Sequence, residues 1–245
     1  MINAKNALKK SVEIYNAEAL FIPHTSLLIP TKNLYNDCMI GIIDFNAGNI
    51  TSLERALNYL NIKFIRSKNP EDLKDCDKYI FPGDGDDAYA MDQLKKSGFD
   101  KFVHQQVEAG KYLLGICVGS QIIFDKSEEG DASCLGLVPG QIRHFYSINP
   151  QMKKDKIKVP HMGWNNITFR HGDCPILKDI TDNSDVYFVH SFVICPTDDN
   201  VIKATADYGI KVPAVIQKGN VFACQFHPEK SGQTGLKIIQ NFCEL

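Results

Sequence analysis

The sequence predicts an α/β fold with a mostly parallel central sheet, helices on both faces and an antiparallel C-terminal portion. Between residues 39 and 124, short apolar runs alternate with segments of helical spacing, which is the pattern of parallel strands joined by helices. After residue 123, strand-like runs follow one another with few helices between them. We therefore expect residues 39–245 to form one domain, and residues 1–38, which show weak periodicity, to be an N-terminal extension of unknown role.

The alternating half contains four apolar runs of strand length, at residues 39–45, 62–65, 79–81 and 112–116. Helices are expected at residues 50–60, 88–96, 99–108 and 118–124. The first of them shows the spacing most clearly, because its apolar residues stand at positions 53, 56, 57 and 60. It follows a turn at residues 46–49 that contains helix-capping residues.

The second half is predicted to consist mainly of strands, at residues 141–147, 163–169, 186–192, 214–218 and 221–226. Gly219 and Asn220 supply turn residues between the last two strands, so we expect a hairpin there. The chain closes with a predicted helix at residues 234–243, which carries Leu236, Ile239 and Phe242 near one face.

The composition is that of an ordinary globular protein. Of 245 residues, 44% are hydrophobic and 23% charged, and the formal net charge is −2. These values argue against a disordered, collagen-like or nucleic-acid-coating protein. No apolar run approaches the roughly 20 residues of a membrane helix, and Pro23 and Pro30 interrupt the stretch that would have to act as a secretory signal. We expect a cytoplasmic protein with neither nucleic-acid nor membrane partners.

The cysteines and histidines predict neither disulfides nor a metal site. Eight cysteines are scattered without a C-x-x-C pair, which is typical of reduced, mostly buried thiols. Seven histidines form neither an H-E-x-x-H motif nor a Cys/His ladder. We therefore expect no metal and no other cofactor.

Cys117 is the first candidate for catalysis. It stands between a predicted strand and a predicted helix and is flanked by Gly115 and Gly119, as in a nucleophile elbow. A helix N-terminus favours a thiolate, and nearby backbone N–H groups can stabilise an oxyanion. Taken alone, the G-x-C-x-G pattern fits a buried structural cysteine equally well.

A histidine near the end of the chain favours the catalytic interpretation. His227 ends an apolar strand 110 residues after Cys117, and Glu229 follows two residues later. A neutral imidazole can take the thiol proton, and a carboxylate can orient the ring and stabilise its charged form. We therefore predict Cys117, His227 and Glu229 as the catalytic residues.

These motifs resemble those of the class I (triad) glutamine amidotransferases, in the segments GICVGSQ at residues 115–121 and HPE at residues 227–229. Further segments are similar to the glutaminase subunits of imidazole glycerol phosphate synthase: IDFNAGN at 43–49, VPHMGWN at 159–165, YFVHS at 187–191 and QFHPEKSG at 225–232. The resemblance begins near residue 39 and runs to the last residue, so it implies a glutamine amidotransferase domain over residues 39–245.

The resemblance implies a mechanism and a partner. Cys117 attacks the side-chain amide of glutamine, His227 shuttles protons, Glu229 holds His227, and a glutamyl thioester is then hydrolysed to glutamate. The ammonia passes to a (β/α)8-barrel cyclase in a heterodimer, which uses it in histidine biosynthesis. By the same resemblance, glutamine is bound by five further residues, namely Gly83, Gly85, Gln121, His190 and Ser191.

One segment departs from the family pattern, and it leaves alternatives open. Where the family usually has Pro-Gly-Val-Gly-Ala-Phe, Asp84 replaces an apolar residue, and Asp86 and Asp87 add two more acids. A carboxylate beside a developing oxyanion would oppose it unless the side chain points to solvent, so an acidic solvated turn is the favoured interpretation. The alternatives are a paralogue that supplies ammonia for the amidination of a surface sugar and, with less support, a catalytically silent scaffold.

Overall fold

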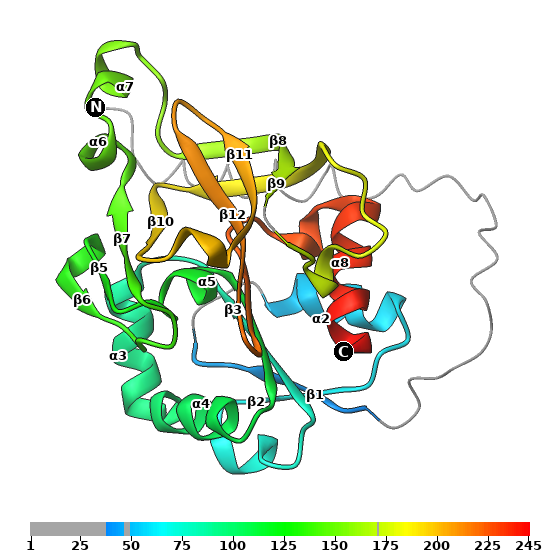
Figure 1. The fold of residues 1–245 in the computed structure, drawn as a ribbon. Coiled ribbons are helices and arrows are strands. Elements are labelled where there is room, and N and C mark those ends of the chain that lie inside the picture. Colours follow the sequence, from blue (N-terminus) through cyan, green and yellow to red (C-terminus); the bar gives the residue numbers. More distant parts are fainter. Residues whose placement is uncertain (1–37, 47–49, 171) are drawn as a thin grey trace, which may run out of the picture. The chain divides into compact units, whose positions relative to one another are not determined.

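The computed structural model describes residues 38–245 except 47–49 and 171 (Figure 1). Nearly all of the predicted N-terminal extension and most of the turn at 46–49 therefore lie outside the described residues. No helix in the described part is long and apolar enough to cross a membrane.

A nine-stranded sheet has the order β2-β1-β3-β4-β13-β12-β11-β8-β9. Its first five strands are parallel to one another: β2 (Phe64–Ser67), β1 (Ile40–Ile43), β3 (Lys78–Gly83), β4 (Tyr112–Cys117) and β13 (Val221–Cys224). The remaining four pair antiparallel: β12 (Lys211–Lys218), β11 (Ile202–Asp207), β8 (His161–Phe169) and β9 (Ser184–His190). The predicted α/β class, with a parallel portion followed by an antiparallel one, is confirmed.

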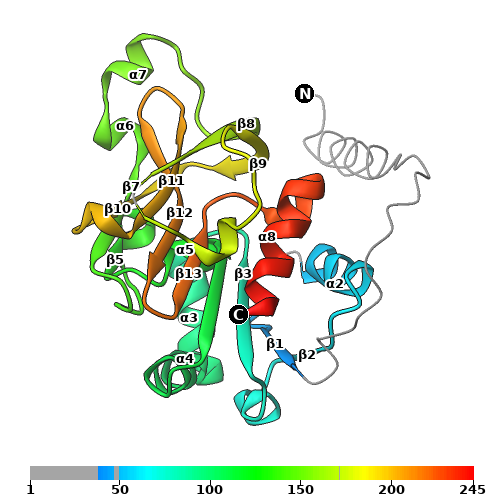
Figure 2. The same ribbon diagram turned by 45° about the vertical axis from the view of Figure 1, so that its right-hand side comes forward.

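Helices cover both faces of the parallel strands (Figure 2). On one face lie α2 (Ile50–Tyr59) and α8 (Gly232–Glu244), and on the other lie α3 (Asp87–Ser97), α4 (Phe99–Glu108) and α5 (Val118–Gln121). The alternation of side chains along β3 explains this, because Ile80 packs in the core below α2 and α8 whereas Tyr79 and Phe81 pack below α3 and α4. Burial on both faces requires the continuous apolar runs that the sequence shows.

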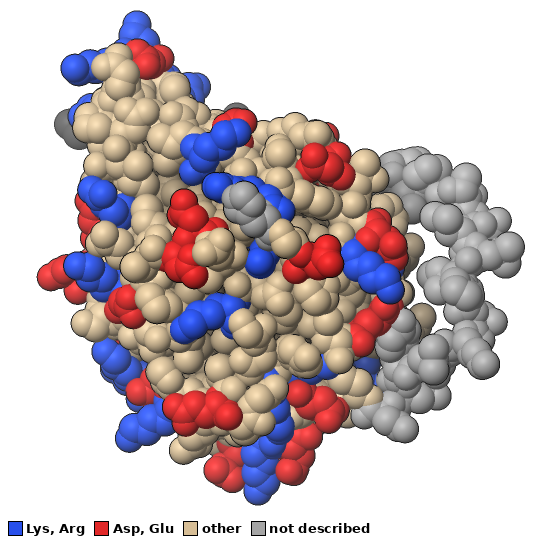
Figure 3. Space-filling view, viewed as in Figure 1, with Lys and Arg blue, Asp and Glu red and all other residues tan. Residues whose placement is uncertain are grey.

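A second, four-stranded sheet has the order β10-β7-β5-β6 and comprises β10 (Phe192–Pro196), β7 (Gly140–His144), β5 (Lys126–Ser127) and β6 (Ala132–Ser133). Two short helices, α6 (Phe145–Ile148) and α7 (Gln151–Lys154), project beyond β7. Exposed lysines lie along this projection, which is at the upper left of Figure 3, where Lys and Arg are blue. Five 3-10 turns complete the described elements: η1 (Pro70–Leu73), η2 (Glu129–Asp131), η3 (Pro175–Leu177), η4 (Asp199–Val201) and η5 (Pro228–Lys230).

Several predicted boundaries are wrong. The strand expected at 62–65 lies at Phe64–Ser67, and the helix expected at 118–124 ends at Gln121. The chain turns out of the helix here: the amide of Phe124 donates to the carbonyl of Gln121, only three residues earlier, and the carbonyls of residues 122, 123 and 124 accept from the amides of residues 135–138. These amides belong to a distant loop, so local periodicity does not reveal the end of the helix.

The strand-rich half also differs in detail. The strand expected at 141–147 ends at His144, whose Nδ1 accepts a hydrogen bond from the amide of Tyr146 at 3.2 Å and begins α6. The strand expected at 186–192 is interrupted at Ser191, which separates β9 from β10. The strands β5, β6 and β11 were not predicted; β5 and β6 have only two residues each.

Candidate active site

Cys117 lies at the junction of β4 and α5 with φ 54° and ψ −111°, a conformation that is strained for a residue with a side chain. Close packing around it holds the turn in place. A Cβ added at Gly115 would lie 2.5 Å from the carbonyl oxygen of Gly119, and one added at Gly83 would lie 2.9 Å from the amide nitrogen of Gly119. Gly83 and Gly115 are therefore needed for β3, β4 and α5 to approach one another, and Gly115 is one of the two flanking glycines that the elbow interpretation predicts.

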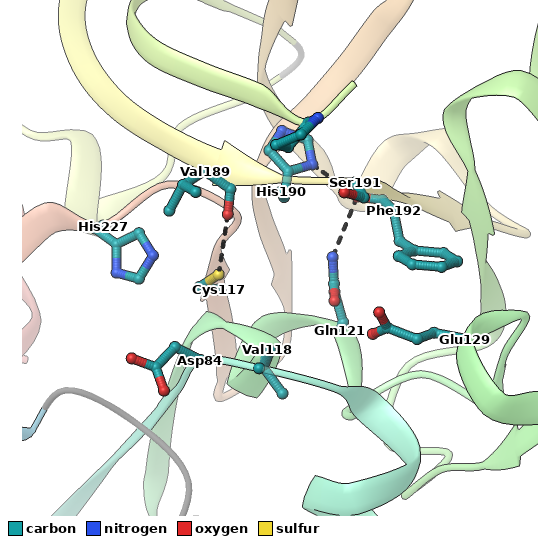
Figure 4. A pocket seen from close by; sticks show the side chains of 12 residues that line it. Asp84, Cys117, Val118, Gln121, Glu129, Val189, His190, Ser191, Phe192 and His227 are labelled. Atoms are coloured by element: carbon teal, nitrogen blue, oxygen red, sulfur yellow. Dashed lines mark hydrogen bonds between the residues drawn. The ribbon is translucent and has the colours of Figure 1, made fainter. Parts of the chain in front are cut away.

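The sulfur of Cys117 faces a cavity of about 240 Å³ (Figure 4). The cavity is lined by residues at or next to the ends of β3, β4, β8, β9, β10 and β13 and by residues of α5 and the η2 turn: Asp84, Gly85, Cys117, Val118, Gln121, Glu129, Pro160, Val189, His190, Ser191, Phe192 and His227. Parallel strands end at the same edge of a sheet, so the topology brings Cys117 and His227 together from positions far apart in the sequence.

His227 and Glu229 form a hydrogen-bonded pair next to the cysteine. The backbone amide of His227 donates to the carbonyl of Tyr187 at 2.9 Å, which anchors the residue to β9. Its Nδ1 lies 2.8 Å from Oε1 of Glu229, because the η5 turn brings the carboxylate back to the ring. Both side chains are about 95% buried. With the Nδ1 proton directed at the carboxylate, Nε2 is left for the cysteine or the substrate.

The charge of His227 depends on its neighbours. Burial lowers the pKa of His227, but the charge of the Cys117 thiolate and the carboxylate of Glu229 outweigh burial and raise the pKa well above its ordinary value. Nε2 is buried without a hydrogen-bond partner among the described residues, and the ring lies beside Cys117 (Figure 4). The Cys117 Sγ also lies 3.8 Å from the carbonyl oxygen of Val189, a weak contact. The raised pKa favours the charged imidazolium form of His227, so a positive charge lies beside the candidate nucleophile.

Four of the five predicted glutamine-binding residues line the cavity: Gly85, Gln121, His190 and Ser191. Gly83 does not line it and packs beneath the elbow instead. Gln121 is held in place because its Nε2 donates to the carbonyl of Phe192 at 3.2 Å. Ser191 lies at the break between β9 and β10, where the backbone turns along the wall of the cavity.

The side chain of His190 is occupied by bonds within the protein. Its Nδ1 lies 2.7 Å from the carbonyl of Phe192, which can only accept, so Nδ1 carries the proton. Its Nε2 then accepts from Nδ1 of His161 at 3.0 Å, and Asn165 donates to the remaining nitrogen of His161 at 3.2 Å. Burial lowers the pKa of both histidines, to about 3 for His190 and about 4 for His161. His190 therefore forms a rigid, neutral wall.

The family model for class-I glutamine amidotransferases matches residues 41–245. The chain belongs to this family. It is 44% identical over 208 residues to the imidazole glycerol phosphate synthase subunit HisH of Bacillus velezensis, an alignment that covers 84% of this chain and 96% of that protein. The HisH subunit of Methanocaldococcus jannaschii is 45% identical, with 84% and 100% covered, and that of Nitratidesulfovibrio vulgaris (strain Hildenborough) is 43% identical, with 83% and 95% covered.

Solved structures support the same fold. A crystal structure of a glutamine amidotransferase has a TM-score of 0.65 at 18% identity and covers 84% of this chain and 97% of its own. The structure of PurLQS from Thermotoga maritima also has a TM-score of 0.65, at 19% identity, and covers 84% and 98%. At these identities the likeness shows the fold of the amidotransferase and nothing further.

The acidic segment of this amidotransferase differs from the solvated turn that was predicted. Asp84 is exposed and its carboxylate turns away from the Cys117 sulfur (Figure 4), so the prediction is correct there. Asp86 is also exposed and caps α3, accepting from the amide of Tyr89 at 2.8 Å. The prediction is wrong for Asp87, which is completely buried as the first residue of α3 and packs under the η2 segment.

Glu129 is a site residue that the sequence analysis missed. It lines the cavity on the far side of Gln121 from Cys117 (Figure 4), and its Oε2 accepts from the amide of Asp87 at 3.0 Å. Burial raises the pKa of Glu129 against the opposing effect of that hydrogen bond. Nothing local distinguishes Glu129 from Glu128, because only the packing of the η2 turn against α3 directs one of them into the cavity.

Among the described residues, no group of three or more His, Cys, Asp and Glu side chains is arranged to hold a metal ion.

Proposed function

We propose that this chain is the glutaminase subunit of imidazole glycerol phosphate synthase, which hydrolyses glutamine to glutamate and ammonia for histidine biosynthesis. The observation that carries the proposal is the meeting of Cys117 with the His227–Glu229 pair in one cavity. The chain that holds them is 43–45% identical to HisH subunits over nearly their whole length.

The cavity suits an amino acid that carries a charge at one end and an amide at the other. Its volume of about 240 Å³ is below the roughly 300–1,000 Å³ of pockets for larger ligands. Cys117 lies on one side of Gln121 and Glu129 on the other. We assign the α-ammonium group of glutamine to Glu129, which leaves the side-chain amide at Cys117.

The first half of the reaction forms a thioester. The Cys117 thiolate attacks the amide carbon, and the carbonyl oxygen becomes an oxyanion beside the amide of Val118, the residue after the nucleophile. His227 donates its Nε2 proton to the amide nitrogen, the C–N bond breaks, and ammonia leaves. Glu229 stabilises the imidazolium until this transfer occurs.

The second half regenerates the enzyme. Water attacks the thioester carbon while His227 takes one of its protons, and the C–S bond breaks to release glutamate and the Cys117 thiolate. The proton taken from water leaves His227 as an imidazolium beside the Cys117 thiolate, and the second proton of that water passes from the new carboxyl group of glutamate to solvent. Cys117 and His227 line the cavity, and Glu229 is hydrogen-bonded to the Nδ1 side of His227, which supports these roles.

A partner subunit is expected to receive the ammonia, and we propose that it is a (β/α)8-barrel cyclase. Met162 and Trp164 support a docking face, because they are large apolar residues two positions apart on β8 and are 51% and 59% exposed. Exposed tryptophan side chains and patches of exposed apolar residues are typical of protein interfaces. The Trp164 ring lies 6.1 Å from that of Tyr187, whose carbonyl anchors His227, so this face adjoins the catalytic turn.

The deciding experiment measures glutamate release by the purified chain, alone and with the histidine-pathway cyclase and its nucleotide substrate. Strong stimulation by the cyclase is expected. A folded chain that hydrolyses glutamine but does not respond to this cyclase would favour the surface-sugar paralogue, because both share the triad and differ in their partner. A chain without glutaminase activity under any of these conditions would favour a silent scaffold.

A further inference from the structure

Asp87 is a buried acid whose hydrogen bonds are incomplete. It is 0% exposed, and its Oδ2 accepts from the hydroxyl of Ser127 at 2.6 Å. Its Oδ1 is also buried and has no hydrogen-bond partner within the described part of the chain. A carboxylate in this position is unfavourable for stability, and such features are concentrated at functional sites.

Three hydrogen bonds join Asp87 to Glu129 in a closed ring. The amide of Asp87 donates to Glu129 Oε2 at 3.0 Å, the amide of Glu129 donates to the hydroxyl of Ser127 at 3.1 Å, and that hydroxyl donates to Asp87 Oδ2. Asp87 thus holds Glu129 directly through its amide and indirectly through its carboxylate. The backbone and the side chain of Glu129 are both restrained.

Packing supports the ring. Gly130 follows Glu129 with φ 67°, and a Cβ there would lie 2.5 Å from the Cβ of Ala88. The η2 turn is therefore seated directly against the first turn of α3. The Glu129 carboxylate accepts from an amide at the N-terminus of this 11-residue helix, a position that favours its charged form.

The groups around Asp87 concentrate negative charge at this end of the cavity. Burial, together with the charges of Glu129 and Asp86, raises the pKa of Asp87 to about 7 against the hydrogen bond from Ser127. The partly buried thiol of Cys134 is another neighbour: burial is the larger cause of its raised pKa, and the charge of Asp87 adds to it. A cation bound beside Glu129 would supply the missing positive charge.

We propose that Asp87 is a positioning residue for glutamine: with Ser127, it holds the Glu129 carboxylate where the α-ammonium group of the substrate binds. The inference rests on the proposed function and adds to it residues that touch no substrate atom.

The test compares glutamine with glutaramate, which is the same molecule without the α-amino group. Kinetics are measured for the wild type and Asp87→Asn, each assembled with its cyclase partner and the nucleotide. The KM for glutamine is expected to rise about tenfold, equivalent to about 1.4 kcal/mol, with kcat within about twofold, because Glu129 binds far from the reacting amide. The KM for glutaramate is expected to stay unchanged.

A merely structural role for Asp87 predicts equal losses with the two substrates, and that result would overturn the proposal. So would an unchanged KM for glutamine. Ser127→Ala should show the same selectivity and decides the question if Asp87→Asn does not fold. Asp86→Asn is the matched control, since it alters the neighbouring exposed acid, keeps an N-capping side chain and should leave both substrates unaffected.

A failure of the proposed glutaminase function can be distinguished from a failure of the positioning role of Asp87. If the wild-type complex does not hydrolyse glutamine, the glutaminase assignment fails, and calorimetric binding of the two compounds to wild type and Asp87→Asn decides the positioning role. Loss confined to glutamine binding supports it. Equal binding of both compounds by wild type, or equal loss in the variant, overturns it.

Discussion

The backbone of Gly119 lies so close to the carbonyl oxygen of Phe81 that a Cβ at Gly119 would be 1.9 Å from that oxygen. This approach joins α5 to β3 and thereby aims Cys117 at the cavity. The geometry of the nucleophile therefore depends on a contact with a strand nearly 40 residues earlier in the chain.

Replacing Gly119 by Ala is expected to lower the free energy of unfolding by about 3 kcal/mol, because β3 and α5 have to move apart. Glutaminase activity should fall as well, since the elbow is displaced. Urea denaturation and glutamate release check both effects. Gly219→Ala is the matched control, because it has φ 56° and open space around it, so it should cost only about 1 kcal/mol and leave activity unchanged. Equal effects of the two substitutions would contradict the prediction.

Cys117→Ser should reduce glutaminase activity at least about a thousandfold, because the hydroxyl of serine does not ionise beside His227 as a thiol does. Affinity for the cyclase should be unchanged, since Cys117 is 5% exposed. Glutamate release and calorimetric titration with the cyclase measure the two properties. Retained activity in this variant would rule out the proposed nucleophile.

Glu229→Gln should lower kcat about 10- to 100-fold while keeping a hydrogen-bond acceptor at 2.8 Å from His227 Nδ1. The carboxylate charge helps to raise the pKa of His227, so that pKa should fall in the variant. NMR titration of the imidazole and steady-state kinetics provide the two readouts. An unaltered His227 pKa would show that Glu229 orients the ring without stabilising its charge.

Asp87 should make the protein less stable as the pH rises. Its pKa is about 7 in the folded protein and about 3.9 in an unfolded chain, so between roughly pH 4 and 7 the folded state binds a proton that the unfolded state does not. Stability attributable to Asp87 therefore falls through this window. In Asp87→Asn this dependence disappears. The free energy of unfolding of the variant minus that of the wild type should therefore increase by about 2–4 kcal/mol from pH 5 to pH 8.

Urea denaturation of Asp87→Asn and wild type at a series of pH values measures this difference directly. Effects of the substitution that do not involve ionisation are the same at every pH and cancel from the comparison. For Asp86→Asn, at an exposed position, the curve of free energy of unfolding against pH should be parallel to that of the wild type. Parallel curves for Asp87→Asn would mean that Asp87 is ionised throughout the range.

Trp164→Ala should weaken binding to the cyclase about 10- to 100-fold, as expected for a central aromatic anchor. The side chain is 59% exposed, so stability of the free subunit should change by less than about 1 kcal/mol. Tyr59→Ala removes another exposed aromatic ring, 49% exposed at the end of α2, and serves as the control. Equal affinities for both variants would place the docking face elsewhere.

Features that depend on short stretches of chain were predictable. Periodicity located the helices α2, α3, α4 and α8 to within a few residues, because each buries one apolar stripe. The sequence also indicated Cys117 and the His227–Glu229 pair, since an elbow needs flanking glycines and the carboxylate is only two residues from the ring. Boundaries set by distant partners, such as the early end of α5, were not predictable.

The sequence by itself determined the alternation of strands and helices in the first half of the domain, the strained turn at Cys117 and the candidate nucleophile, base and orienting acid, because these follow from local spacing and local backbone sterics. Only the tertiary structure decided that Glu129 enters the cavity, that Asp87 is buried against Ser127, and that His190 is bonded to His161. Those contacts join residues 42, 40 and 29 positions apart. Burial and hydrogen bonding across such separations depend on how the elements pack, which no local pattern in the sequence records.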